Sequence, residues 1–351
     1  MVSTLFRRGL AATTLCVAAT SQAHATIPSP YAGHDAERHL WLAGAGSDLR
    51  QQTILGASHL TSLVGRQLTA LVLRRDANAT AYPAGAATWT VTVSSSPAAT
   101  YDSSDTFADN LGADAVQVFH GTVAFPASPP TAGAAATWGP ADTVRVVFQT
   151  PFAYTGGRLC VDITGAAVAG QQSAAWLADA HAVDPTGAAT SIGGGCGPFA
   201  AQSYVDRYGL SVGGTATFTT GGTPNSFSFA LTGQALLAPL PLASVGIGLP
   251  NSGCSVMLDP TLLMPVWLTD ALTPSMGIGA WSVRIPNDSN LQGLGFTTQW
   301  LDLAQEATTD AITWSIGARH SLDMVTIEGA PSAATGRITT NLAHVLRFEH
   351  Q

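Results

Sequence analysis

The sequence contains no lysine, so all 14 of its permanently basic side chains are arginine. This absence excludes catalysis through a lysine Schiff base or a lysine general base. Charged residues make up only 10% of the chain, whereas ordinary globular proteins have about 25%. The surface must therefore be covered largely by Thr, Ser, Ala, Gly and Asn, which is more typical of an extracellular β-protein than of a cytosolic enzyme.

Sequence motifs for nucleophilic catalysis are also missing. There is no Gly-x-Ser-x-Gly turn, and no local pattern pairs a histidine with a serine or cysteine nucleophile. A glycosidase needs two facing carboxylates, and nothing in the sequence selects one pair among the aspartates. Four histidines, His59, His120, His181 and His320, are scattered along the chain with no such partner nearby in the sequence. The only glutamates are Glu37, Glu306, Glu328 and Glu349. The sequence favours a non-catalytic protein, with a secreted hydrolase as an alternative.

The first 25 residues have the features of a signal peptide. Arg7 and Arg8 precede an apolar run over residues 10–19, and Ala23-His24-Ala25 is a small-x-small cleavage site. The apolar run is too short to span a bilayer, although an uncleaved N-terminal anchor is the alternative. We therefore expect a secreted, periplasmic or cell-surface protein with no membrane span after cleavage.

Cleavage would remove 25 of the 351 residues and leave 326, which is enough for about two domains. The mature chain would carry 12 arginines against 22 carboxylates, a net charge of −10. This acidity argues against nucleic acid and anionic lipid as partners.

Alternating hydrophobic residues are the main structural signal. In residues 88–93, Trp89, Val91 and Val93 alternate with threonines, as on a half-buried β-strand. No long segment outside the signal peptide has the 3.6-residue period of a helix, which excludes helical bundles and α/β folds. Further strands are predicted at residues 51–57, 67–74, 143–149, 158–164, 174–182, 210–219, 226–232, 255–259, 266–269, 280–285, 295–303 and 311–316.

The spacing of these segments predicts an all-β protein with two antiparallel β-sandwich modules of jelly-roll type in series. Residues 26–182 form the first module, 183–198 a glycine-rich linker and 199–320 the second module. Residues 321–351 are expected to be a C-terminal extension that adds an edge hairpin or trails loosely.

Three cysteines follow the signal peptide, and export permits a disulfide between them. Cys196 and Cys254 both lie in glycine-flanked loops, so we predict that they form a disulfide, which would stabilise the fold by about 4 kcal/mol. Cys160 shares a predicted strand face with Arg158 and Asp162, so it is expected to stay unpaired. Three free thiols are the alternative, and metal binding is disfavoured because there is no Cys-x-x-Cys pair.

Residues 115–125 predict a β-bulge. Val116 and Val118 share one alternation phase, while Val123 and Phe125 share the other. One extra residue near His120 would place all four side chains on the inside. Because bulges often lie beside functional sites, His120 is a candidate ligand-binding residue, with an ordinary histidine at a strand kink as the alternative.

A resemblance to a known group follows from several segments. Residues 106–114 and 118–121, Gly195-Cys196, Gly253-Cys254 and residues 291–293 with Gln299 resemble a pattern of exported bacterial proteins of unknown function. The resemblance covers most of the mature chain loosely and carries no catalytic motif. It implies two β-rich modules and a link between Cys196 and Cys254.

A dense acidic segment suggests calcium as the only candidate cofactor. The carboxylates of Asp102, Asp105, Asp109 and Asp114 would supply oxygen ligands, although their spacing differs from that of an EF-hand loop. The alternative is a capped helical turn, in which Asp102 is the N-cap and Asp105 interacts favourably with the first turn.

Carbohydrate binding is the main functional hypothesis. Trp89, Trp281 and Trp314 have inward phases. Tyr101, Trp138 and Tyr154 lie in predicted loops or strand ends, where exposed rings would stack on sugars. A structural or surface-associated module that binds other proteins is the alternative.

Overall fold

The computed structural model describes residues 23–131, 135–171, 175–183, 186–245, 253–268, 276–319, 322–340 and 342–351. Most of the predicted signal peptide, residues 1–22, and also His320 lie outside these ranges. Ala23, His24 and Ala25 pair with the C-terminal strand, so cleavage after Ala25 would leave two residues of the first strand in place.

The described residues form an all-β protein, as the alternation predicted. Every pairing between two named strands is antiparallel. The described helices are short 3-10 turns: η1 (Ser29–Ala32), η2 (Ala57–His59), η3 (Thr61–Leu63), η4 (Thr100–Asp102), η5 (Phe107–Asn110), η6 (Arg207–Gly209), η7 (Leu242–Val245) and η8 (Ser289–Leu291). None of the helices in the described ranges has the length and apolar character needed to cross a membrane.

Strands from both ends of the chain build three sheets, which we call the terminal sheets. The four-stranded sheet has the order β1 (Ala23–Ile27), β22 (Leu346–His350), β4 (Arg66–Arg74) and β7 (Thr143–Tyr154). The six-stranded sheet has the order β20 (Arg337–Thr339), β19 (Met324–Gly329), β3 (Leu49–Leu55), β8 (Leu159–Ala167), β5 (Gly85–Ser95) and β6 (Val116–Phe125). The three-stranded sheet has the order β2 (Arg38–Trp41), β9 (Leu177–Ala182) and β21 (Leu342–His344).

One hydrophobic core joins the four-stranded and six-stranded sheets. Leu71 and Phe348 enter it from the four-stranded sheet, while Trp89, Val91 and Val161 enter it from the six-stranded sheet. Alternation sets this arrangement, because consecutive residues of a strand point to opposite faces. The apolar phase of each strand is therefore buried, and the other phase of β4, β7 and β22 forms an outer face.

The predicted β-bulge is present in β6, two residues before His120. The register with β5 changes between Phe119 and Gln117, so Val118 is the extra residue. Val118, Val123 and Phe125 are all buried in the same core, which a regular two-residue period would not permit.

The remaining strands form two further sheets, which we call the middle sheets. One has the order β10 (Ala189–Gly193), β18 (Ala311–Ser315), β16 (Gly295–Asp302), β13 (Phe227–Pro241) and β14 (Ser255–Trp267), with β17 (Ala307–Thr308) paired to β16. The other has the order β11 (Ser203–Asp206), β12 (Thr215–Gly222) and β15 (Gly277–Arg284). Phe218, Trp300 and Trp314 lie in the core of these sheets.

The Cys196–Cys254 disulfide is confirmed, with the two Cα atoms 5.4 Å apart. Gly193, Gly194 and Gly197 have φ angles of 77°, 86° and 77°, a left-handed conformation that glycine adopts without steric cost. This turn brings Cys196 to the start of β14. Cys160 is buried and unpaired, as expected.

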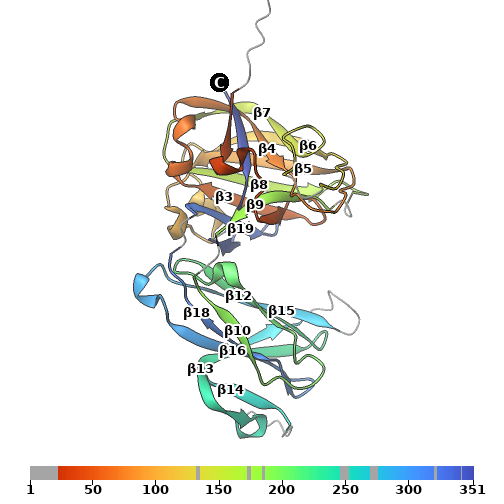
Figure 1. The fold of residues 1–351 in the computed structure, drawn as a ribbon, viewed down its shortest axis with the longest axis vertical. Helices are drawn as coiled ribbons and strands as arrows, with labels where there is room; N and C mark the ends of the chain where they lie inside the picture. Colours follow the sequence, from red (N-terminus) through yellow and green to blue (C-terminus); the bar gives the residue numbers. More distant parts are fainter. Residues whose placement is uncertain are drawn as a thin grey trace, which may run out of the picture.

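The C-terminal residues form the expected edge hairpin in part: β19 and β20 pair antiparallel at the edge of the six-stranded sheet, whereas β21 and β22 belong to the other two terminal sheets, so the chain does not trail loosely here. β22 lies inside the four-stranded sheet between β1 and β4, and β19 lies between β20 and β3. Figure 1 shows the blue C-terminal strands in the upper body, with the middle sheets below it. The middle sheets are thus inserted between β9 and β19. The predicted linker 183–198 also contains a strand, β10.

Polar contacts connect the terminal and middle sheets. The Arg337 guanidinium lies 2.9 Å from an Asp206 carboxylate oxygen, and the Arg284 guanidinium donates to the Ser103 carbonyl at 3.0 Å. Arg319 lies over the Tyr101 ring at 4.1 Å. These contacts are charged or polar, unlike the two hydrophobic cores on either side.

Candidate functional site

The candidate site is a groove on the outer face of the four-stranded sheet, which we call the Trp138 groove. It has a volume of about 310 Å³, within the range of about 300–1,000 Å³ typical of small-molecule sites. Its lining residues are Val72, Trp138, Pro140, Thr143, Arg145, Arg347 and Glu349.

Strand register places the polar residues of the groove together. Arg347 of β22 pairs with Val72 of β4, and Val72 pairs with Arg145 of β7. Side chains of directly paired residues share one face of a sheet. Arg347, Val72 and Arg145 therefore form one row across three strands, and Glu349 lies two residues beyond Arg347 on the same face.

Trp138 lines the groove and is held by its loop. The indole Nε1 donates to the Ala32 carbonyl at 2.9 Å. The backbone N–H and hydroxyl of Thr137 donate to an Asp142 carboxylate oxygen at 3.1 and 2.7 Å, which fixes the turn before β7. These bonds lower the pKa of Asp142, although burial acts in the opposite direction and is the largest single influence. The Trp138 ring is therefore a fixed wall of the groove.

Two guanidinium groups lie over the Trp138 ring. The Cζ atom of Arg347 is 3.8 Å from the ring centroid and that of Arg74 is 4.8 Å away. Such cation–π contacts are favourable, and they also mean that the indole already has arginine partners. A ligand in the groove would meet the Arg347 guanidinium as well as the Trp138 ring.

Arg145 and Arg347 differ in their charge balance. Arg145 forms a two-bond ion pair with Glu349, with contacts of 2.7 and 2.5 Å. Arg347 forms no ion pair within the described ranges, and its Nε donates to the Thr26 hydroxyl at 3.2 Å. Burial and the nearby Arg74 charge lower the pKa of Arg347 to about 10, so the group stays cationic at neutral pH.

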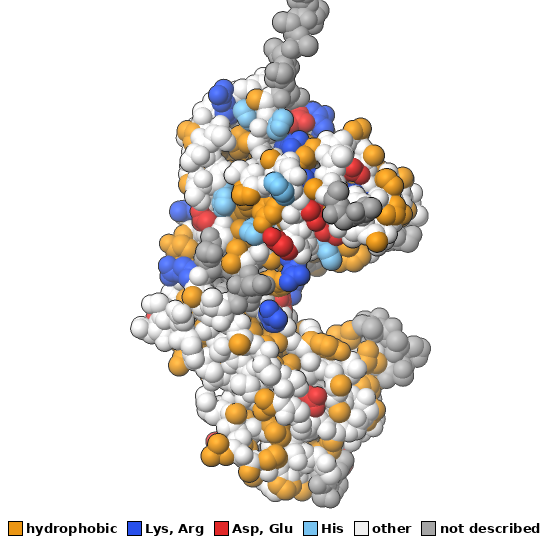
Figure 2. Space-filling view, in the orientation of Figure 1, with side chains coloured by type: hydrophobic (Ala, Val, Ile, Leu, Met, Phe, Trp, Pro, Cys, Tyr) orange, Lys and Arg blue, Asp and Glu red, His pale blue; other side chains and the backbone are white. Residues whose placement is uncertain are grey.

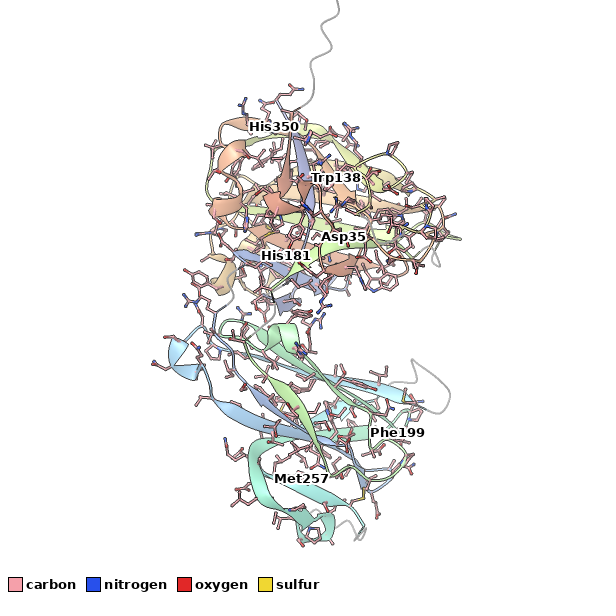
Figure 3. All side chains as sticks on the ribbon, viewed as in Figure 1. Asp35, Trp138, His181, Phe199, Met257 and His350 are labelled. Carbon is pink, nitrogen blue, oxygen red and sulfur yellow. A yellow bond between two sulfur atoms is a disulfide. The ribbon has the colours of Figure 1, made fainter. Side chains whose placement is uncertain are left out.

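A buried acidic cluster lies next to the groove, and Arg74 connects the two. The Arg74 side chain is fully buried and forms an ion pair with Asp179. One carboxylate oxygen of each of Asp35, Asp76 and Asp179 lies within 4.8 Å of the others. Figure 3 shows Trp138, Asp35 and His181 in the upper body. In the part of the chain that the structure describes, this is the only such group of three possible metal ligands.

The bonds within the cluster suit a proton better than a divalent cation. Asp179 is bonded to Arg74 and to the Ala36 N–H, and Asn78 donates to Asp76 at 2.6 Å. Burial, Asp179 and Asp76 raise the pKa of Asp35 to about 6, against the lowering influence of the Ala77 N–H and Arg74. A proton on Asp35 therefore reduces the negative charge without displacing any of these bonds.

A smaller polar group lies near this cluster. The Tyr31 hydroxyl is 2.7 Å from His181 Nδ1 and 3.3 Å from a Glu37 carboxylate oxygen. Burial and the Glu37 charge raise the pKa of Tyr31 to about 12, so the phenol keeps its proton. Glu37 and Tyr31 both contact Nδ1 of His181. A proton relay through a histidine instead uses its two different ring nitrogens, so this group is not arranged as such a relay.

The sequence-predicted ligand residues do not come together. Trp138 lines the groove, whereas Tyr154 is only 2% exposed in the core, so the expected exposed ring is wrong at this position. The half-buried Tyr101 lies in η4 against Arg319. His120 is exposed on β6, with Nδ1 at 2.9 Å from the Thr90 hydroxyl.

The predicted calcium ligands do not converge either. All four carboxylates are exposed, and no three of them lie within 4.8 Å of one another. Asp109 accepts from the Ser104 hydroxyl and Asp114 from the Ser95 backbone and side chain. The segment does contain the short turns η4 and η5, but the capped-turn alternative is wrong in its details, because the N-caps are Ala99 and Thr106, neither makes a side-chain capping bond, and Asp102 ends η4.

Arg145 and Arg347, which line the groove, are not among the residues predicted from the sequence. The available signal was the alternation of residues 346–350, where Leu346 and Phe348 point inward while Arg347 and Glu349 point outward. That pattern predicts that Arg347 and Glu349 share the outer face of a strand, but it does not predict which strands pair with that strand.

Figure 2 shows histidine and most charged side chains on the upper body, while the lower body is mainly uncharged. The sequence agrees, since there is no histidine between residues 182 and 319. Comparison with known proteins gives no match to a protein family, to a curated protein or to a solved structure. The resemblance to exported bacterial proteins therefore stays a prediction.

Proposed function

We propose that this protein is exported and non-catalytic, and that it binds carbohydrate in the Trp138 groove. The observation that carries the proposal is the combination of an indole ring with Arg145, Arg347 and Glu349 along one open groove. Sugars offer apolar C–H faces to an aromatic ring and hydroxyls to charged side chains, so these groups match both parts of a sugar.

Export is supported by the predicted signal peptide and by the disulfide, since disulfides persist mainly in oxidising compartments. Binding is favoured over hydrolysis because a glycosidase needs two facing carboxylates, whereas the groove lining holds one, Glu349, which is bonded to Arg145. Turnover of a panel of chromogenic glycosides and esters by the purified protein would favour the hydrolase alternative.

Retention on immobilised polysaccharides tests the proposal. We expect Trp138→Ala to weaken binding at least tenfold while the melting temperature changes little. Trp41→Ala is the matched control, because Trp41 is 47% exposed and lies outside the groove. Tyr204→Ala tests the smaller rival groove that Tyr204 lines in the middle sheets. No retention on any glycan, or loss only in Tyr204→Ala, would contradict the assignment.

A second candidate is protein binding through β13 and β14. Leu237 is fully exposed, at 108%, and Leu240 and Leu262 are 42% and 41% exposed on the same strands. Exposed large apolar side chains mark an interaction surface when they are contiguous, and Leu237 and Leu240 lie three residues apart on β13. Sedimentation velocity of wild type and Leu237→Ser would detect self-association through this surface, and an unchanged monomer in both would count against that form of the proposal.

A further inference from the structure

The Trp138 groove carries a local positive charge on an otherwise acidic protein. Its lining includes two arginines and one glutamate, which gives a net charge of +1, whereas the whole chain has a net charge of −8. Arg145 and Glu349 neutralise each other through their two-bond ion pair. The excess charge therefore belongs to Arg347.

The Arg347 guanidinium lies in a half-buried position, where a positive charge is unfavourable unless an anion is bound to it. It is half-buried, and its only described side-chain hydrogen bond is to the neutral hydroxyl of Thr26. The buried Arg74 charge lies nearby and raises the cost of a second cation, and the Glu349 carboxylate, which is bonded to Arg145, offsets this cost only in part. Arg74 is already paired with Asp179, so it cannot itself serve as the anion site.

The position of Arg347 also fits recognition of an oxyanion. Its guanidinium lies over the Trp138 ring, which restricts the orientation of the hydrogen-bond donors. Guanidinium groups bind carboxylates, sulfates and phosphates through two parallel hydrogen bonds. Arg347 and Arg145 are two strands apart, or about 10 Å at the usual strand spacing, so one sugar unit and its neighbour would reach both.

We propose that the Trp138 groove selects an acidic glycan and that Arg347 binds an oxyanion on its sugar ring. This inference rests on the proposed carbohydrate function. Two sources share this chemistry, the carboxylate of a uronic acid and the sulfate ester of a sulfated sugar. The acidic protein surface would repel such a polymer elsewhere, which confines binding to this groove.

Isothermal titration calorimetry with two matched oligomers tests the inference. Galacturonic acid oligomers carry a carboxylate where galactose oligomers carry a hydroxymethyl group. We expect the acidic oligomers to bind at least tenfold more tightly, and Arg347→Gln to remove this preference. Arg66→Gln is the matched control, because Arg66 is an exposed arginine at the start of β4 and outside the groove. Dextran sulfate compared with dextran tests the sulfate source.

The possible failures are distinguishable. Equal affinity for acidic and neutral oligomers, lost in Trp138→Ala, would leave the carbohydrate function standing and overturn the oxyanion inference. If no oligomer binds, isothermal titration calorimetry with sodium sulfate decides. A signal lost in Arg347→Gln would support the oxyanion site and reject the glycan function, while no signal would overturn the oxyanion site.

Two further measurements guard against a misfolded variant. Arg347→Lys keeps the charge but loses the two-pronged donor, so we expect an intermediate affinity for the acidic oligomer. In the wild-type protein, raising the salt concentration should weaken binding of the acidic oligomer but not that of the neutral one. A salt-independent affinity for the acidic oligomer would contradict the role of Arg347.

Discussion

Replacing Asp35 with asparagine should stabilise the protein at alkaline pH and have little effect at acidic pH. The substitution removes the charge while keeping the Oδ1 atom that accepts from the Ala77 N–H at 3.2 Å. The nearby groups that share the cluster are Asp76 and Asp179, with Arg74 bonded to the latter and His39 at 3.6 Å from the former.

The sign follows from the pKa of Asp35, which burial and the two neighbouring carboxylates raise from 3.8 to about 6. The folded protein binds this proton more tightly than the unfolded chain, so the contribution to stability is full below pH 3.8 and is lost as pH rises through about 6. At 1.36 kcal/mol per pKa unit the full effect is about 3 kcal/mol. Solvent that reaches the half-buried side chain reduces it to about 1–2 kcal/mol.

Urea unfolding of wild type and Asp35→Asn at pH 4 and pH 8 measures the effect. We expect the variant to gain about 1 kcal/mol relative to wild type between the two pH values, since other titrating groups cancel in the difference. Asp259→Asn, at an exposed carboxylate of β14, is the control and should show no such gain. An equal difference in unfolding free energy between Asp35→Asn and wild type at both pH values would refute the charge argument.

Three other predictions concern stability and thiol reactivity. Replacing both Cys196 and Cys254 with serine removes a disulfide between residues that are 58 positions apart. Urea unfolding should then show a free energy of unfolding lower by about 4 kcal/mol, as the chain-entropy model of disulfides predicts. A decrease below about 1 kcal/mol would contradict that model. Arg74→Met leaves the buried Asp179 carboxylate unpaired, so the free energy of unfolding should fall by about 3–5 kcal/mol. Adding Asp179→Asn should restore part of this loss. Thermal unfolding of the single and double variants tests the prediction, and no rescue would argue against the ion pair. Burial raises the pKa of the Cys160 thiol well above its ordinary value, so Ellman's reagent should react with it only in denaturant, and fast reaction of the folded protein would contradict its burial.

The candidate site could be predicted from the sequence only in part. Trp138 is predictable because it lies in a loop rich in Pro, Ala and Gly, and it lines the groove. The same reasoning fails for Tyr154, which is buried because β7 extends to this residue and its ring lies in the apolar phase. Arg347 is not predictable, since a single arginine in an alternating segment is ordinary until its neighbours are known.

The bulge in β6 is a feature that the alternation within one short segment was sufficient to predict. A change of phase within one segment requires an extra residue if both halves face one core, and Val118 supplies it. The Cys196–Cys254 link was also accessible, because three cysteines in an exported chain leave few pairings and glycines flank these two.

The sequence by itself determined the all-β class, the choice of inward side chains and the absence of lysine chemistry, because alternation and composition are properties of short segments. The tertiary structure alone decided that β22 enters the sheet between β1 and β4, which brings residues more than 250 positions apart into one row. Backbone hydrogen bonds can pair any two strands, so the partner of a strand depends on how the whole apolar surface is buried. Arg347, Val72 and Arg145 meet for that reason, and the groove that they line follows from it.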